Sequence, residues 1–168
     1  MGNPCREEKL QLAIEFAQNT KTEFSLYCID VDNLRLINDV YGYIVGDIVL
    51  KNVADHLREA LTDPFAVARI GDDEFGVIIM DVGPAEALAK AQVLCKSIVE
   101  MEINPLGDDG IFITNSIGVA SYPYNGQALD DLMLAAEVAC ITSVERNPVA
   151  QPAGRQPVGK GVTDNGGV

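Results

Sequence analysis

Residues 68–79 read ARIGDDEFGVII, and this stretch indicates a β-hairpin. Ala66–Ile70 and Phe75–Met80 are two apolar runs of extended character. They are joined by Gly71-Asp72-Asp73-Glu74, a short polar sequence that suits a tight turn. The hairpin therefore predicts two neighbouring antiparallel strands near the middle of the chain.

Segments of helical and extended periodicity alternate on both sides of this hairpin. Helices are predicted over 6–18, 34–40, 46–61, 84–100 and 127–143, and further strands over 24–29 and 111–121. Without the outer helices the order is β-α-β-β-α-β. This order predicts an α+β fold, the split βαββαβ pattern of a ferredoxin-like palm, with additional helices.

Apolar residues at helical spacing indicate which helix faces are buried. In the first helix Leu10, Ile14 and Phe16 are predicted to share one face. In the helix over 46–61 the predicted buried residues are Ile48, Val49, Val53, Leu57 and Leu61.

Composition limits the class of protein. The 168 residues contain 12 Lys and Arg against 25 Asp and Glu, a net charge of −13, with 48% hydrophobic residues. This balance favours one globular domain and disfavours nucleic acid as a partner, because phosphate binding requires a basic face. No apolar run approaches the roughly 18 residues of a membrane span.

Residues 148–168 contain five Gly and three Pro without Leu, Ile or aromatic residues. We therefore expect a folded domain over 1–147 and a disordered tail over 148–168.

Residue types that often bind zinc or act as nucleophiles are scattered. The cysteines are Cys5, Cys28, Cys95 and Cys140, and no two form a CxxC pair. We expect buried, reduced thiols and a cytoplasmic location. His56, the only histidine, has no partner pattern for general-base catalysis and is expected at the surface of its helix.

Two acidic groups follow strand segments, at residues 30–32 (Asp-Val-Asp) and 72–74 (Asp-Asp-Glu). In a split βαββαβ sheet the first strand and the hairpin are neighbours, so the two groups are expected to meet. Converging carboxylates repel one another, and a hard cation such as Mg²⁺ relieves the repulsion. The alternative is that Asp32 caps the next helix and Asp72-Asp73 only form the turn.

Three blocks of the chain, Ile29–Leu50, Ala68–Ile79 and Ser116–Pro123, resemble the GGDEF family of diguanylate cyclases in order and spacing. The likeness runs from about Gly2 to Asn147. It implies a nucleotidyltransferase palm of the nucleotide cyclase and polymerase type, in which each of two facing domains holds one GTP. The 3′-hydroxyl of each GTP attacks the α-phosphate of the other, which gives the bacterial second messenger cyclic di-GMP.

The resemblance also implies partners and a setting. The substrate is GTP, and catalysis needs a second GGDEF domain in a homodimer. We expect a sensor or output domain elsewhere in a larger signal-transduction protein, of which this chain is the cytoplasmic part.

By match to the family motif, the resemblance implies a site for Mg²⁺ (or Mn²⁺) formed by Asp30, the Val31 carbonyl, Asp73 and Glu74. Asp73 and Glu74 are also implied as the catalytic residues. A metal-activated 3′-hydroxyl requires no histidine base.

The family's guanine-reading pair is matched by Asn38 and Asp47, an amide and a carboxylate suited to the purine edge. The alternative for this pair is helix capping around Gly42. The resemblance implies four further substrate-binding residues, Gly71, Asp72, Arg35 and Arg146.

The chain also departs from the family pattern. The signature reads GDDEF, so Asp72 replaces the second glycine, which adds bulk and repels phosphate. Where the family has a phosphate-binding Lys and a Gly, residues 141–147 read ITSVERN, so both are missing. The family's product-inhibition motif RxxD falls at residues 62–65, which read TDPF, so feedback binding through that motif is not expected.

Three hypotheses follow. The first is a degenerate GGDEF domain that binds GTP with weak or lost cyclase activity and has a regulatory role. The second is a diguanylate cyclase that is active when dimerised. The third is a dimerisation or interaction module that does not bind nucleotides.

Overall fold

The computed structural model describes residues 4–61, 66–107, 110–143 and 149–150. The elements are α1 (Pro4–Thr20), β1 (Phe24–Val31), α2 (Leu34–Tyr41), α3 (Tyr43–Ala60), β2 (Ala66–Arg69), β3 (Glu74–Met80), α4 (Pro84–Val99), β4 (Asn115–Tyr122), α5 (Leu129–Ser143) and β5 (Val149–Ala150). No described helix has the length and apolar character needed to cross a lipid bilayer.

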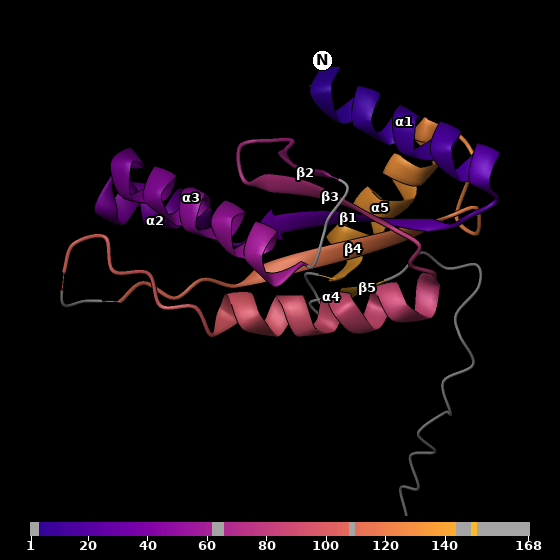
Figure 1. Ribbon diagram of the computed structural model, residues 1–168. Coiled ribbons are helices and arrows are strands. Elements are labelled where there is room, and N and C mark those ends of the chain that lie inside the picture. Colours follow the sequence, from indigo (N-terminus) through magenta and orange to yellow (C-terminus); the bar gives the residue numbers. More distant parts are fainter. Residues whose placement is uncertain (1–3, 62–65, 108–109, 144–148, 151–168) are drawn as a thin grey trace, which may run out of the picture.

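The strands form one sheet in the order β2-β3-β1-β4-β5 (Figure 1). β2 and β3 are the predicted hairpin, and β1 pairs antiparallel with both β3 and β4. The crossovers pass through α2 and α3 and through α4, so the predicted βαββαβ palm with additional helices is confirmed. The predicted 1–147 boundary stays a prediction; beyond it, Val149–Ala150 pairs parallel with β4, and the rest of the predicted tail lies outside the described residues.

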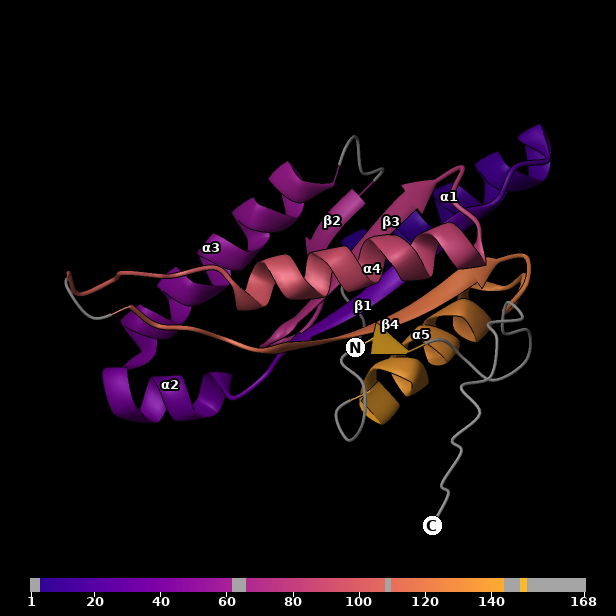
Figure 2. The ribbon, with the colours of Figure 1, turned by 90° about the horizontal axis from the view of Figure 1, so that it is seen from below.

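Helices cover both faces of the sheet, which explains why apolar residues of β1 are buried on both of its faces. Tyr27, Ile29 and Val31 point into a core shared with α2, α3 and α4. Phe24, Leu26 and Cys28 alternate with them and point into a second core shared with α1 and α5. Figure 1 shows α4 and α1 on opposite sides of the sheet, and in Figure 2 α4 crosses the strands in front.

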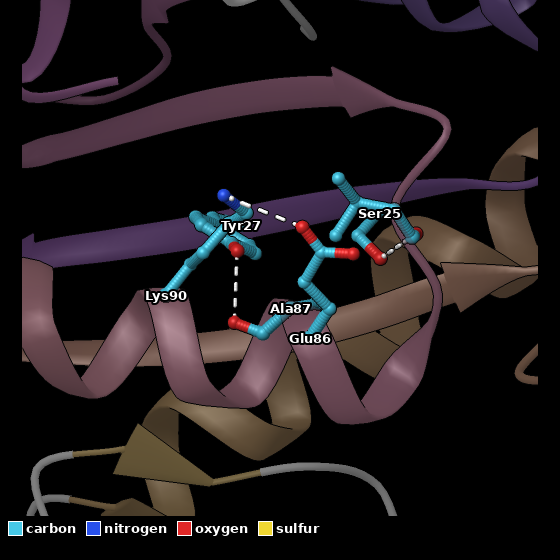
Figure 3. Close-up of polar contacts among 6 residues, drawn as sticks. Ser25, Tyr27, Glu86, Ala87 and Lys90 are labelled. Carbon is cyan, nitrogen blue, oxygen red and sulfur yellow. Dashed lines mark hydrogen bonds and ion pairs between the residues drawn. The ribbon is translucent and has the colours of Figure 1, made fainter. Parts of the chain in front are cut away.

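Two polar contacts fix α4 and the segment before it against β1 (Figure 3). The Tyr27 hydroxyl donates to the Ala87 carbonyl at 2.8 Å, and the Ser25 hydroxyl donates to the Val82 carbonyl at 2.8 Å. Burial raises the pKa of Tyr27, so the phenol stays protonated and remains a donor. On the outer side of α4, Glu86 and Lys90 form an exposed ion pair, which contributes little.

The other face depends on a close approach between α5 and β4 at Gly118. A Cβ on this glycine would collide with the backbone of Ala136 and Cys140. The missing side chain therefore lets α5 lie directly on the sheet.

The buried face of α1 differs from the prediction. Leu10 and Ile14 are buried as expected, together with Ala13 and Ala17, but Phe16 is 49% exposed. The buried set follows the i, i+3, i+4, i+7 pattern. Phe16 is two positions from Ile14, about 200° around the helix, so its placement on that face was wrong.

Two further expectations change in detail. The strand predicted over 111–121 begins only at Asn115, because Ile111 pairs instead with Ile103 in an isolated bridge before it. His56 is half-buried rather than on the open surface, and its Nε2 lies 2.8 Å from the Ser97 hydroxyl of α4. The described cysteines Cys28, Cys95 and Cys140 are buried thiols outside any disulfide, as predicted.

Candidate functional site

The two predicted acidic groups meet where β1 and β3 pair. The antiparallel register places Asp30 directly opposite Glu74. One residue further, the Val31 amide donates to the Asp73 carbonyl at 2.9 Å. The end of β1 is thereby joined to the acidic turn by backbone hydrogen bonds, which fixes the spacing of the carboxylates.

The electrostatics of this corner centre on Asp30. Burial is the largest cause that raises the pKa of Asp30 to about 6, and the charges of Asp73, Glu74 and Asp32 add to it. A half-buried carboxyl group among other carboxyl groups leaves negative charge uncompensated, and a bound cation would compensate it. Among the described residues, however, no three or more His, Cys, Asp or Glu side chains are grouped as metal ligands.

Asp32 has a different role from the predicted helix cap. Its carboxylate accepts hydrogen bonds from Thr114 Oγ1 at 2.8 Å and from Ser116 Oγ at 3.2 Å. Its backbone amide donates to the Thr114 carbonyl at 2.9 Å. The capping position of α2 is Asn33, without a side-chain capping bond. The cap assignment was therefore wrong, because Asp32 joins the end of β1 to the start of β4.

The turn between β2 and β3 is braced by Arg69, which sequence reasoning missed. Arg69 Nε donates to the Gly71 carbonyl at 3.0 Å and Nη2 donates to the Asp72 carbonyl at 2.6 Å. The Gly71 position is crowded, since a Cβ there would come within 2.9 Å of Glu74 Oε2. The sequence feature that could have indicated this contact is the position of Arg69, two residues before the turn glycine Gly71.

Asp72, the departure from the family signature, is exposed. It is not among the described residues with positive φ, and neither is Gly71. The turn therefore imposes no left-handed backbone at residue 72, and aspartate causes no backbone strain there. What Asp72 changes is charge and bulk.

Asn38 and Asp47 lie on α2 and α3, on either side of Gly42. The Gly42 amide donates to the Asn38 carbonyl at 2.8 Å, and Gly42 has a φ of 88°, a conformation that favours glycine. Asn38 Oδ1 is buried and has no hydrogen-bond partner. It rests against Gly46, where a Cβ would collide with it. Neither α2 nor α3 has a side-chain capping bond at its N-terminus, which disfavours the capping alternative.

A groove of about 340 Å³ is lined both by Asp47 and by Arg69, the residue that braces the turn. It runs between α3 and the β2–β3 hairpin. Two further cations on its wall, Lys51 and Arg58, were also missed by sequence reasoning; Arg58 forms an exposed ion pair with Asp55 at 3.3 Å. Their separation along the chain from the hairpin hides this arrangement in the sequence.

Of the other predicted binding residues that the structure describes, none lines this groove: Asn38, Gly71, Asp72 and Arg35 are not among its lining residues. Arg35 is exposed on the first turn of α2. Arg146, like the segment over 62–65, lies outside the described residues.

Comparison with known proteins identifies similar domains. Residues 5–147 match the family described as "Diguanylate cyclase, GGDEF domain". MucR of Pseudomonas aeruginosa, a bifunctional diguanylate cyclase/cyclic di-GMP phosphodiesterase, is 33% identical over 133 residues, which are 79% of this chain and 19% of that protein. Diguanylate cyclase A of Treponema denticola is 34% identical over 123 residues, 73% of this chain and 33% of that protein. The chain thus spans a third or less of the length of these relatives.

Solved structures show the same fold. The GGDEF domain of YfiN (TpbB) from P. aeruginosa has a TM-score of 0.79 at 28% identity, covering 86% of this chain and 92% of that chain. The GGDEF domain of DgcB from Caulobacter crescentus, solved in complex with c-di-GMP, has a TM-score of 0.75 at 25% identity and covers 86% of each chain.

Proposed function

The chain belongs to the GGDEF family of diguanylate cyclases, and on that premise we propose that it binds GTP with a divalent cation but has weak or lost cyclase activity. Its role in cyclic di-GMP signalling would then be regulatory. The observation that carries the proposal is the pairing of Asp30 with Glu74 beside the Asp73 turn, where burial and the neighbouring carboxylates raise the pKa of Asp30 to about 6.

The donor set suits Mg²⁺ or Mn²⁺ shared with a nucleotide. Asp30, Asp73, Glu74 and the Val31 carbonyl would hold the cation, which supplies charge neutralisation at the phosphates and activation of a hydroxyl. Mg²⁺ often uses only one or two carboxylates and takes its other ligands from phosphate and water. The absence of a three-carboxylate cluster among the described residues is compatible with such a site.

The base would be held by Asn38 and Asp47. A guanine presents an N1–H and an exocyclic amine, which a carboxylate and an amide oxygen accept. Asn38 Oδ1 is a buried acceptor without a partner, and such a group gains most from a new donor. The groove lined by Asp47 and Arg69 would take the nucleotide from Asp47 towards the turn that Arg69 braces.

Weak turnover is inferred from Asp72 and from the missing phosphate-binding Lys. The carboxylate of Asp72 is exposed on the turn that would face the phosphates, so it repels them. Catalysis would also need a second copy of the domain as partner.

An active cyclase is the second candidate, and one observation favours it. The turn is braced through backbone carbonyls by Arg69, and residue 72 has no positive φ. Aspartate can therefore occupy this turn without distorting it, and a forced dimer that produces cyclic di-GMP steadily would favour this candidate.

Titration calorimetry with GTP and Mg²⁺ tests the proposal. We expect micromolar binding that weakens at least tenfold in Asp47→Ala. Asp55→Ala removes the same charge from the same helix and should bind within twofold of the wild type. Equal binding by both variants would contradict the role of Asp47, and no binding at millimolar GTP would favour a module that does not bind nucleotides.

A further inference from the structure

Two cysteines that are 112 positions apart in the sequence, Cys28 and Cys140, meet in the folded protein. Cys28 is on β1 and pairs in register with Gly118 of β4. Cys140, on α5, packs on that same glycine, since a Cβ on Gly118 would lie within 2.9 Å of Cys140 Cα. The close approach of α5 to the sheet therefore brings Cys140 beside Cys28.

The two thiols contact each other inside one core. Both are buried, with 4% and 5% of their surface exposed. Both belong to the same core cluster, and each shifts the pKa of the other, raising that of Cys28 and lowering that of Cys140. Cys140 Sγ also donates to the Ser116 carbonyl at 3.5 Å. Cys95 offers a natural contrast, because it lies in the opposite core with its Sγ 3.8 Å from the Asn115 carbonyl.

A small cavity reaches Cys28. It lies between α1, α5 and the sheet, and its wall includes Cys28, Ala136 and Glu137. Its volume of about 30 Å³ corresponds to about one water molecule. Lys9, an exposed residue, also lines it, so the cavity leads from the surface to the Cys28 thiol.

We propose that Cys28 and Cys140 are a peroxide-sensitive thiol pair that forms an intramolecular disulfide between β1 and α5. One thiol, as its thiolate, attacks hydrogen peroxide, breaks the O–O bond and becomes a sulfenic acid, with release of one water. The second thiol attacks that sulfur, forms the S–S bond and releases a second water. Two thiols and one peroxide thus give one disulfide and two waters.

The link would affect stability and lie near the acidic corner. Cys28 and Asp30 are two residues apart on β1 and therefore share a face of the sheet. The disulfide would close a loop of 112 residues and restrict the unfolded chain. This inference does not depend on GTP binding, so either proposal can fail alone.

Peptide mapping under non-reducing conditions tests the pair, in a Cys5→Ser background to avoid exchange with that thiol. The folded protein is treated with hydrogen peroxide, alkylated and digested. We expect a cross-linked peptide that joins residues 28 and 140, and a thermal midpoint raised by roughly 5–15 °C. Dithiothreitol should reverse both changes.

Matched variants keep the test independent of any one substitution. Cys140→Ala should give neither the cross-link nor the rise in midpoint, and Cys95→Ala should retain both. The peptide map of the Cys5→Ser protein tests for the cross-link even if Cys140→Ala does not fold. Separate oxidation of the two thiols without a cross-link, or two free thiols after treatment, would overturn the proposal.

Discussion

Asp30 of β1 lies directly opposite Glu74 of β3 in the antiparallel register, and the Val31 amide beside it donates to the Asp73 carbonyl at 2.9 Å. Sheet pairing, rather than chain proximity, therefore gathers the carboxylates. The sheet is buried on both faces in this region, so its backbone resists relaxation away from the repulsion. The corner keeps its negative charge at a cost in stability, which is the usual sign of a binding function.

The repulsion predicts that stability falls as the pH rises. The pKa of Asp30 is raised to about 6, whereas an unfolded aspartate titrates near ~3.9. Between these values the folded state holds more protons, so the free energy of unfolding decreases towards about pH 6 and then levels off. The group is partly exposed, so we expect a loss of only about 1 kcal/mol.

Denaturant unfolding at pH 5 and at pH 7.5, with a chelator present, measures this effect. Asp30→Asn should reduce the difference between the two pH values. If the free energy of unfolding differs between the two pH values by the same amount in the variant and in the wild type, Asp30 is not the cause of the difference.

Gly46→Ala should separate stability from binding. The new methyl group would collide with Asn38 Oδ1 and displace the amide. Alanine is the better helix former by about 1 kcal/mol, which partly offsets the collision. We expect GTP affinity to fall at least tenfold while the circular dichroism spectrum stays helical. The account fails here if Gly46→Ala binds GTP as tightly as the wild type.

Tyr27→Phe tests how α4 is held on the sheet. The substitution removes the donor to the Ala87 carbonyl and leaves the ring in place (Figure 3). A loss of about 1–2 kcal/mol in the free energy of unfolding is expected. Tyr41→Phe removes a hydroxyl from a tyrosine that is 47% exposed and should change stability by less than about 0.5 kcal/mol. Similar losses in the two variants would contradict this account of the contact.

Asp72→Gly should increase cyclic di-GMP synthesis by a forced dimer. The backbone at residue 72 tolerates either residue, so the gain would come from the removal of charge and bulk beside the phosphates. Asp72→Asn removes the charge and keeps the bulk, and it therefore separates the two effects. Product formation by the wild type at the rate of Asp72→Gly would show that Asp72 does not limit turnover.

The fold was largely predictable from the sequence because its signals are local. The hairpin around residues 71–74 and the periodicity of the main helices identify the elements, and their order gives the palm. The meeting of Asp30 with residues 73–74 followed from that topology, since strands that pair bring their ends together.

The parts that were not predicted depend on tertiary contacts. The hydrogen bonds from Thr114 and Ser116 give Asp32 a bridging role in place of the expected cap. The contact between Cys28 and Cys140 exists only because Gly118 admits α5 to the sheet. No local pattern encodes such pairs, which arise from packing between distant segments.

The central claim is that this corner binds GTP through a divalent cation. Titration calorimetry of the wild type and Asp30→Asn, each with Mg²⁺ and with chelator, tests it most directly. We expect micromolar affinity of the wild type for GTP with Mg²⁺, and at least tenfold weaker binding of GTP after chelation or in Asp30→Asn. Affinity that is unchanged by both, or no binding at millimolar GTP, would contradict it.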